Sequence, residues 1–135
     1  KENPYKSIVM DQENQEHPVS NMFDNRLNTH CELPLSAEKA TITIELKSER
    51  YITGCSLPKD AEGVTEFKVY VTNDKSQKGN VIIKGNGKKD TYQAIQWDNG
   101  FTVQRGKKGC FVIIEIDKTV AKPATFTDFG FLFGD

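Results

Sequence analysis

The amino-acid sequence predicts an all-β fold, a β-sandwich that forms a single domain. Apolar residues alternate with polar ones in several short segments, and residues that favour tight turns separate these segments. No stretch keeps apolar residues at positions i, i+3, i+4 and i+7 over three turns, so no long helix is expected. A length of 135 residues suits one domain with one core.

Four segments carry the clearest strand patterns. Residues 41–46 and 66–72 alternate apolar with polar side chains, which is typical of strands with one buried face. Residues 110–116 are apolar at nearly every position and are predicted to form a central strand. Residues 129–134 are predicted to form the last strand. The expected core residues are Ile42, Ile44, Phe67, Val69, Val112 and Ile114.

The turn signals between these segments favour the same architecture. Asn99-Gly100 is the most specific of them, because a type I′ hairpin turn needs positive φ at both of its central residues. It predicts a hairpin between residues 92–97 and 101–105. Short strands joined by tight turns indicate a sandwich or barrel rather than parallel β-α-β units.

A loop near the N-terminus carries a family resemblance. Asn21 to Thr29, with the sequence N-M-F-D-N-R-L-N-T, resembles the loop A-x-D-G-N-x-x-T of discoidin domains, the type C domains of coagulation factors and family 32 carbohydrate-binding modules. Further segments resemble the strands of this family in the same order, at residues 41–46, 51–58, 65–74, 110–116 and 128–134.

This resemblance covers about residues 20 to 134 and implies a jelly-roll sandwich of the galactose-binding-like type. It assigns residues 20–135 to the sandwich and residues 1–19 to an N-terminal lead-in segment. The sequence departs from the family pattern at Asn25, where a Gly is usual, and at Cys31, where a Trp is usual. Asn tolerates a left-handed backbone better than most residues.

The resemblance also implies a structural calcium or sodium ion in the loop. An oxygen-only set of ligands suits a hard cation. The residues themselves support an alternative, in which the loop side chains only cap a tight turn by bonding its backbone amides. The ligands carried over from the family are the carbonyls of Asn21, Arg26 and Thr127, the side chains of Asp24 and Asp128, and Thr29 through its hydroxyl and carbonyl.

Three residues supply the chemistry of a sugar site. A pyranose face stacks on an exposed aromatic ring, and neighbouring side chains bond its hydroxyls. Trp97 beside the predicted hairpin turn, Arg105 at the end of that hairpin, and His30 in the ion-type loop meet these needs. The alternatives are a core position for Trp97, a solvated charge at Arg105 and a plain loop residue at His30.

Motifs for catalysis and for zinc are missing. The sequence has no Gly-x-Ser-x-Gly, no His-Glu-x-x-His and no phosphate-binding loop, so the chain is not expected to be an enzyme. Its three cysteines lie far apart and are expected to be free thiols. With only two histidines, His17 and His30, and no cysteine at the spacing of a zinc motif, no structural zinc site is predicted.

Charge and composition narrow the class of partner. The 18 basic and 19 acidic residues nearly cancel, which argues against nucleic acid and anionic membranes. No apolar run approaches the roughly 20 residues of a membrane-spanning helix. We predict a monomeric, non-catalytic module that binds carbohydrate, outside the cell or at its surface. A protein-interaction module, which the free thiols would suit inside a cell, stays open as the alternative.

Overall fold

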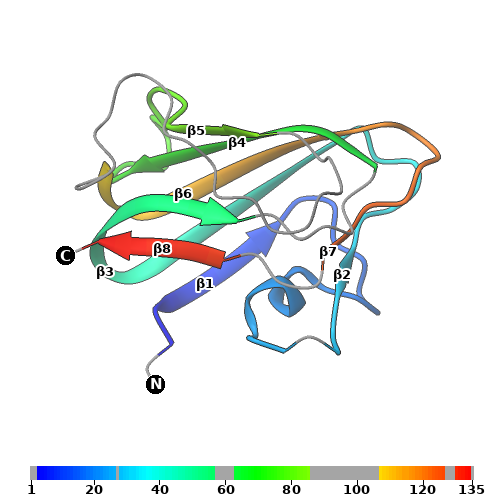
Figure 1. Cartoon of the computed structure of the whole chain (residues 1–135), viewed down its shortest axis with the longest axis horizontal. Coiled ribbons are helices and arrows are strands. Elements are labelled where there is room, and N and C mark those ends of the chain that lie inside the picture. The colour runs from blue at the N-terminus through cyan, green and yellow to red at the C-terminus, as the bar shows by residue number, and fades with distance from the viewer. Residues whose placement is uncertain (1–2, 27, 57–62, 86–106, 127–129, 135) are drawn as a thin grey trace.

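A computed structural model describes residues 3–26, 28–56, 63–85, 107–126 and 130–134 (Figure 1). It consists mainly of antiparallel strands with one short 3-10 helix in the described part of the chain. The elements are β1 (Tyr5–Met10), η1 (Val19–Phe23), β2 (Cys31–Glu32), β3 (Lys39–Ser56), β4 (Val64–Thr72), β5 (Ile83–Gly85), β6 (Lys107–Lys118), β7 (Thr125–Phe126) and β8 (Gly130–Gly134).

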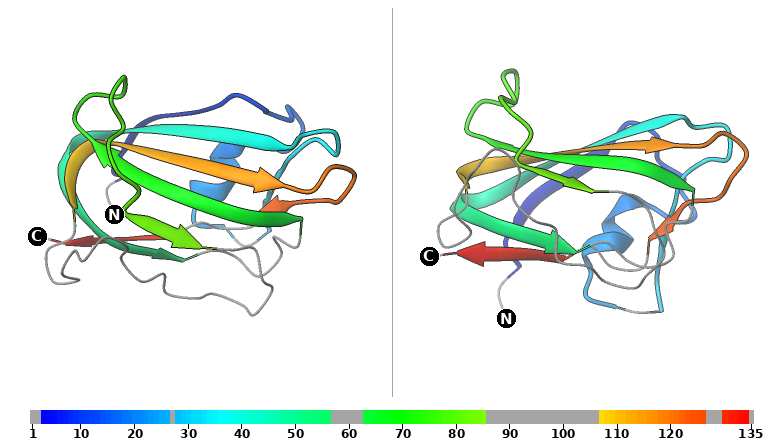
Figure 2. Two further views of the ribbon diagram at one scale, coloured as in Figure 1. Left: turned by 90° about the horizontal axis from the view of Figure 1, so that it is seen from above. Right: turned by 45° about the horizontal axis from the view of Figure 1, so that its top comes forward.

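The main sheet has the strand order β1-β3-β6-β4-β5, and all of its pairings are antiparallel. Strand β3 shifts register against β6 between Glu45 and Arg50, and its second half pairs with β8. Figure 2 shows this second half and β8 in a layer apart from the long strands. Strands β2 and β7 form a separate small sheet. The predicted all-β sandwich is therefore confirmed.

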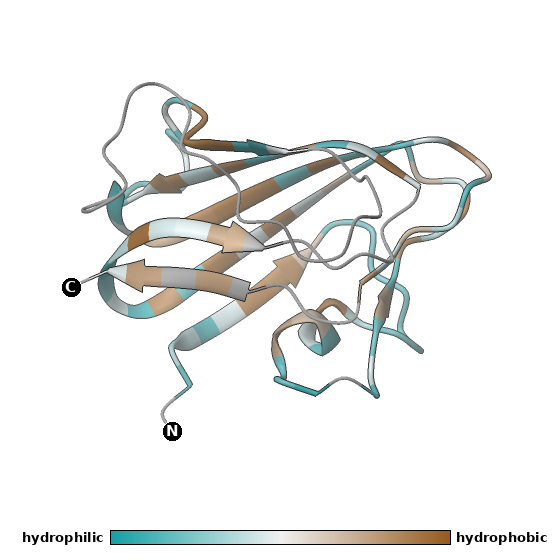
Figure 3. Ribbon diagram, viewed as in Figure 1, coloured by the Kyte–Doolittle hydropathy of each residue, from teal (hydrophilic) through white to brown (hydrophobic). Residues whose placement is uncertain are grey.

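The core lies on the inner face of the long strands, where the predicted alternation places it. All six expected core residues are 1% exposed or less. Strand β6 runs between β3 and β4, so the prediction of a central strand at residues 110–116 is correct. Ile114 stands opposite Ile42 on one side and Val69 on the other. Figure 3 shows hydrophobic and hydrophilic residues alternating along these strands.

The N-terminal residues take part in the sheet. Residues 1–19, assigned above to a lead-in segment, include β1, which pairs with β3 from Tyr5 opposite Leu46 to Met10 opposite Ile42. The alternation in β1 is weak, because Val9 is 61% exposed and only Met10 is fully buried. The hairpin predicted for residues 92–105 lies outside the described residues.

The three cysteines are free thiols, as predicted. Cys31 and Cys55 are buried, and Cys110 is half-buried. Burial, with a smaller effect from Glu13 and Glu32, raises the pKa of Cys31 to about 12, and burial raises the pKa of Cys55 as well. Since the thiolate is the reactive form, both are inert core residues near neutral pH. In the described part of the chain, no helix is long and apolar enough to span a membrane.

Candidate ligand-binding site

The loop predicted to hold an ion is closed by its own side chains. The carboxylate of Asp24 accepts a hydrogen bond from the amide of Arg26 at 3.0 Å and another from the hydroxyl of Thr29 at 2.6 Å. Asn25 has a φ of 59°, so it does adopt the left-handed conformation expected at the Gly position of the family loop. These contacts are those that the capped-turn alternative predicts.

The other predicted ion ligands are less closely grouped. The side-chain amide of Asn21 donates a hydrogen bond to the carbonyl of His30 at 2.9 Å, so it ties η1 to the segment before β2. Arg26 is exposed. Thr127 and Asp128 lie outside the described residues, so the structure places only part of the predicted set.

His30, predicted as a ligand-binding residue, meets two residues that the sequence patterns did not single out for a site. Its ring stacks on that of His17, with ring centroids 4.0 Å apart and an angle of 21° between the planes. One carboxylate oxygen of Glu32 lies 3.2 Å from Nε2 of His30 and 3.9 Å from Nε2 of His17. All three side chains are half-buried. We call them the His17/His30/Glu32 cluster.

Backbone hydrogen bonds hold this cluster in place. The amide of Glu32 donates to the carbonyl of His17 at 3.1 Å, which fastens the loop before η1 to β2. The bond from Asn21 fixes the carbonyl of His30. Between His30 and Glu32, the buried Cys31 stands opposite the buried Phe126 of β7. The cluster therefore lies on a fixed backbone and presents its polar atoms to solvent.

A sequence signal for part of the cluster was available. In an extended segment, alternate side chains point to opposite faces. A buried Cys31 therefore places His30 and Glu32 together on the other face. His17 carried no such signal, because it lies in a separate loop that reaches β2 through the hydrogen bond from the Glu32 amide to the His17 carbonyl.

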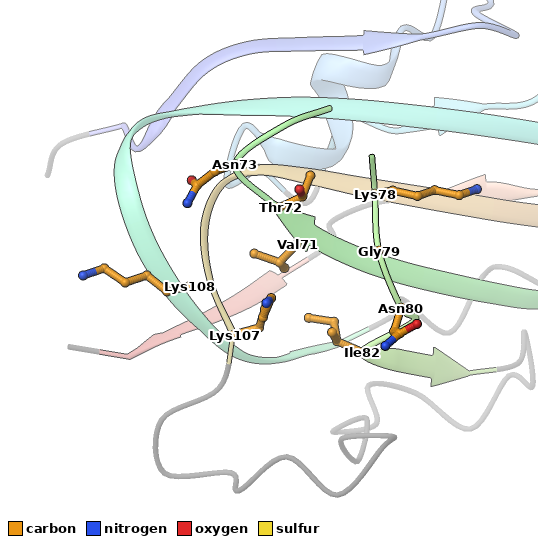
Figure 4. A pocket seen from close by; sticks show the side chains of 9 residues that line it. All are labelled: Val71, Thr72, Asn73, Lys78, Gly79, Asn80, Ile82, Lys107 and Lys108. Atoms are coloured by element: carbon orange, nitrogen blue, oxygen red, sulfur yellow. The ribbon is translucent and has the colours of Figure 1, made fainter. Parts of the chain in front are cut away.

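A second feature is a cavity of about 260 Å³ at the other end of β6 (Figure 4). Three lysines contribute to its lining, and two of them pair with carboxylates of different strands. Lys78 pairs with Glu115, and Lys108 lies 3.8 Å from Glu49. In Figure 4 these two side chains point in different directions. Two of the three ammonium groups are therefore engaged with carboxylates rather than aimed together into the cavity.

Comparisons with known proteins identify the fold. No protein-family model matches the sequence, and no curated protein matches it. Solved structures do match over nearly the whole chain. The family 32 carbohydrate-binding module of NanJ from C. perfringens, in complex with galactose, matches with a TM-score of 0.72 at 12% identity, over 93% of this chain and 91% of that one. The present chain has the fold of a family 32 carbohydrate-binding module.

Two further structures support the same conclusion. The CpGH89CBM32-5 module from Clostridium perfringens, in complex with GalNAc-β-1,3-galactose, has a TM-score of 0.73 at 15% identity, covering 93% of this chain and 94% of its own. The family 32 module of AlyQ, in complex with 4,5-unsaturated mannuronic acid, has a TM-score of 0.72 at 11% identity and covers 95% of both chains. The resemblance inferred from the sequence is confirmed for the fold.

The described residues include only one of the three residues predicted for the sugar site. His30 belongs to the His17/His30/Glu32 cluster. Trp97 and Arg105 lie outside the described residues, so their roles stay predictions. The candidate site on the described residues is therefore the cluster, with His17 in the loop before η1, His30 directly before β2 and Glu32 in β2.

Proposed function

We propose that the chain is a non-catalytic carbohydrate-binding module and that the His17/His30/Glu32 cluster forms part of its sugar site. The observation that carries the proposal is the cluster itself, in which half-exposed donors and acceptors converge on a fixed backbone. The matched structures support it, since they are modules of the same fold in complex with galactose, GalNAc-β-1,3-galactose and 4,5-unsaturated mannuronic acid.

The chemistry of the cluster suits neutral hydroxyl groups. The Glu32 carboxylate accepts hydrogen bonds from two adjacent sugar hydroxyls, and an imidazole donates through one ring nitrogen and accepts through the other. A neutral ligand also agrees with the near balance of basic and acidic residues. A shallow surface with few hydrogen bonds binds weakly, so we expect a Kd of about 0.1–1 mM.

The same geometry argues against glycoside hydrolysis. That reaction normally needs two carboxyl groups about 5–9.5 Å apart, one of them as an acid. Within the cluster, the one carboxylate is that of Glu32, which contacts two imidazoles rather than a second acid. We propose a module that holds its sugar unchanged, works as a monomer, and acts outside the cell or at its surface.

Sugar binding is tested with a glycan array, followed by calorimetric titration of the saccharides that bind. Glu32→Gln removes the charge but keeps the shape, and we expect affinity to fall at least about tenfold, because hydrogen bonds to charged groups contribute about 1.5–3 kcal/mol. Glu49→Gln is the matched control, since Glu49 is an exposed acid whose carboxylate lies near Lys108. It should bind as the unchanged protein does.

If the Glu32→Gln variant binds sugar as well as the unchanged protein does, the sugar site lies elsewhere. The Trp97→Ala variant then tests whether the ring of Trp97 is the stacking surface predicted from the sequence. If Trp97 is that surface, the variant loses binding and keeps its melting temperature. Blue-shifted fluorescence that resists soluble quenchers would instead make Trp97 a core residue. A pull-down beside the array tests the protein-interaction alternative, which gains if no saccharide binds and a protein does.

A structural calcium ion in the Asp24 loop is a separate part of this proposal. Both carboxylate oxygens of Asp24 already accept hydrogen bonds, yet each keeps a free lone pair, and Thr29 donates its proton and so keeps its own lone pairs. The described part of the predicted set therefore fits a hard cation. When bound, the ion would add charge neutralisation and stiffness to the loop.

Calcium should then raise the melting temperature, because a ligand of the folded state alone adds RT ln(1 + [L]/Kd) to the free energy of unfolding. Asp24→Ala is expected to abolish this increase, and Asp74→Ala, at an exposed acid in another turn, should retain it. Melting curves with millimolar calcium and after full chelation make the measurement. Identical curves in both conditions would leave the loop as a capped turn.

A further inference from the structure

We propose that the His17/His30/Glu32 cluster binds a divalent transition-metal ion, with Zn²⁺ as the best match. This goes beyond carbohydrate binding and does not depend on it, although it concerns the same residues. The two histidines are the only ones in the sequence, and the fold brings them together from positions 13 residues apart. One ring nitrogen of each histidine and a carboxylate oxygen of Glu32 all lie within 4.8 Å of one another.

The donor atoms select the class of metal. Two imidazole nitrogens and one carboxylate oxygen form a set that suits Zn²⁺, Ni²⁺ or Cu²⁺, whereas Ca²⁺ and Mg²⁺ prefer oxygen alone. The Asp24 loop, with oxygen ligands alone, therefore suits calcium, whereas the cluster suits a transition-metal ion. The sequence predicts no structural zinc site, because there are only two histidines and no cysteine at the spacing of a zinc motif. The structure offers a different kind of site, with three ligands and no thiolate.

The distances are close to those that a bound ion needs. Bonds of about 2.0–2.1 Å in a tetrahedral site place neighbouring ligand atoms about 3.3–3.4 Å apart. Nε2 of His30 and the Glu32 oxygen are already 3.2 Å apart. Nε2 of His17 is 3.9 Å from that oxygen and must approach by roughly half an ångström to match the tetrahedral spacing.

Small side-chain rotations complete the geometry. The stacked rings are nearly parallel, at 21°, so each must turn about its terminal torsion to aim its lone pair at one point. Those torsions are broad and soft. The side chains are 36% exposed at His17, 32% at His30 and 41% at Glu32, which leaves room for such turns.

The backbone around the cluster is already in place. The bond from the Glu32 amide to the His17 carbonyl and the bond from Asn21 to the His30 carbonyl fix the two ends of the site. Little chain has to be ordered when an ion enters, which favours binding. Three protein ligands leave the fourth position of a tetrahedral ion open toward solvent, where a water or an oxygen of a second ligand completes the coordination.

The test uses the full chain without a histidine tag, stripped with a chelator and titrated with zinc chloride by calorimetry. We expect one ion per chain. His17→Gln, His30→Gln and Glu32→Gln should each weaken binding at least about tenfold, because even a residue that only orients a metal ligand contributes about 10–100-fold. Glu49→Gln and Cys110→Ser are controls with unchanged affinity, the latter at the half-buried thiol.

Nuclear magnetic resonance of the histidine rings gives a second readout. With two histidines in the sequence, each single variant assigns the remaining ring, and zinc should shift both rings of the unchanged protein. Adding excess calcium to the zinc-bound protein should not reverse the shifts of the histidine-ring resonances. Melting curves of the metal-free variants show whether each variant is folded.

Several outcomes would overturn the proposal. The first is that zinc produces neither heat in the titration nor a shift of the histidine-ring resonances. The others are that zinc affinity survives the loss of both histidines, or that it is lost in Cys110→Ser. Saccharide titration in the presence of chelator keeps the two proposals apart. Sugar binding without zinc binding overturns the metal site alone, and zinc binding without sugar binding overturns the proposed function alone.

Discussion

Ile114→Ala is expected to lower the free energy of unfolding by about 2–5 kcal/mol, the range found for large-to-small changes in buried cores. Ile114 is completely buried at the middle of β6, with Ile42 of β3 and Val69 of β4 as its neighbours in register. Strands pack on both sides of it, so the structure cannot collapse easily into the space that the lost methyl groups leave. Urea unfolding followed by circular dichroism measures the change.

Val9→Ala is the matched control, because Val9 also lies in a strand of the same sheet but is 61% exposed. Its effect should stay within about 0.5 kcal/mol, as for most surface substitutions. An Ile114→Ala loss as small as that of Val9→Ala would contradict a central position for β6. A changed m-value would show instead that the substitution alters how much surface unfolding exposes.

The strands could be predicted because their residues alternate with the period of a pleated sheet. What the alternation does not show is where one strand ends. The separate segments 41–46 and 51–58 belong largely to the single strand β3, Lys39–Ser56. Four polar residues interrupt the apolar pattern at positions 47–50, and the strand bends there to reach β8. In the sequence pattern alone, such a polar interruption looks like a loop between two strands, although the strand continues through the bend.

The candidate site was harder to predict than the fold. His30 and Glu32 follow from the alternation around a buried Cys31, but His17 joins them through a backbone bond that no side-chain pattern records. The residues of the Asp24 loop, in contrast, do carry a sequence signal. They match a motif, and their hydrogen bonds are equally those of a capped turn, so the sequence alone does not say whether an ion is bound.

Lys118 has a structural role that its residue type does not predict. In a sequence, a lysine is normally assigned to the surface, yet Lys118 is only 5% exposed. Its ammonium group donates hydrogen bonds to the carbonyls of Leu35, Thr119 and Lys122, at 3.1, 2.9 and 2.8 Å. Burial lowers the pKa of Lys118, so the charge carries a desolvation cost that these three bonds offset.

Lys118→Met should lower the free energy of unfolding by about 1.5–3 kcal/mol, because it keeps the apolar stem and removes a charged donor. The three carbonyls belong to the loop after β2 and the loop between β6 and β7, so the ammonium holds these loops together. The same loops position the small β2-β7 sheet, on which the His17/His30/Glu32 cluster is built. Saccharide binding should therefore weaken in the variant even at temperatures where it is folded.

Lys122→Met is the control, since Lys122 lies in the same loop with an exposed side chain, and it should leave both stability and binding unchanged. Chemical unfolding and saccharide titration of the two variants side by side make the comparison.

If Lys118→Met proves as stable as the unchanged protein or more so, the cost of burying the ammonium exceeds the benefit of its three hydrogen bonds. The same result is found when some buried charges are replaced by apolar residues of similar size. In that case the loops are held by β2-β7 pairing and by the bond from the Leu33 amide to the Ala124 carbonyl, at 3.1 Å, and saccharide binding should survive the substitution.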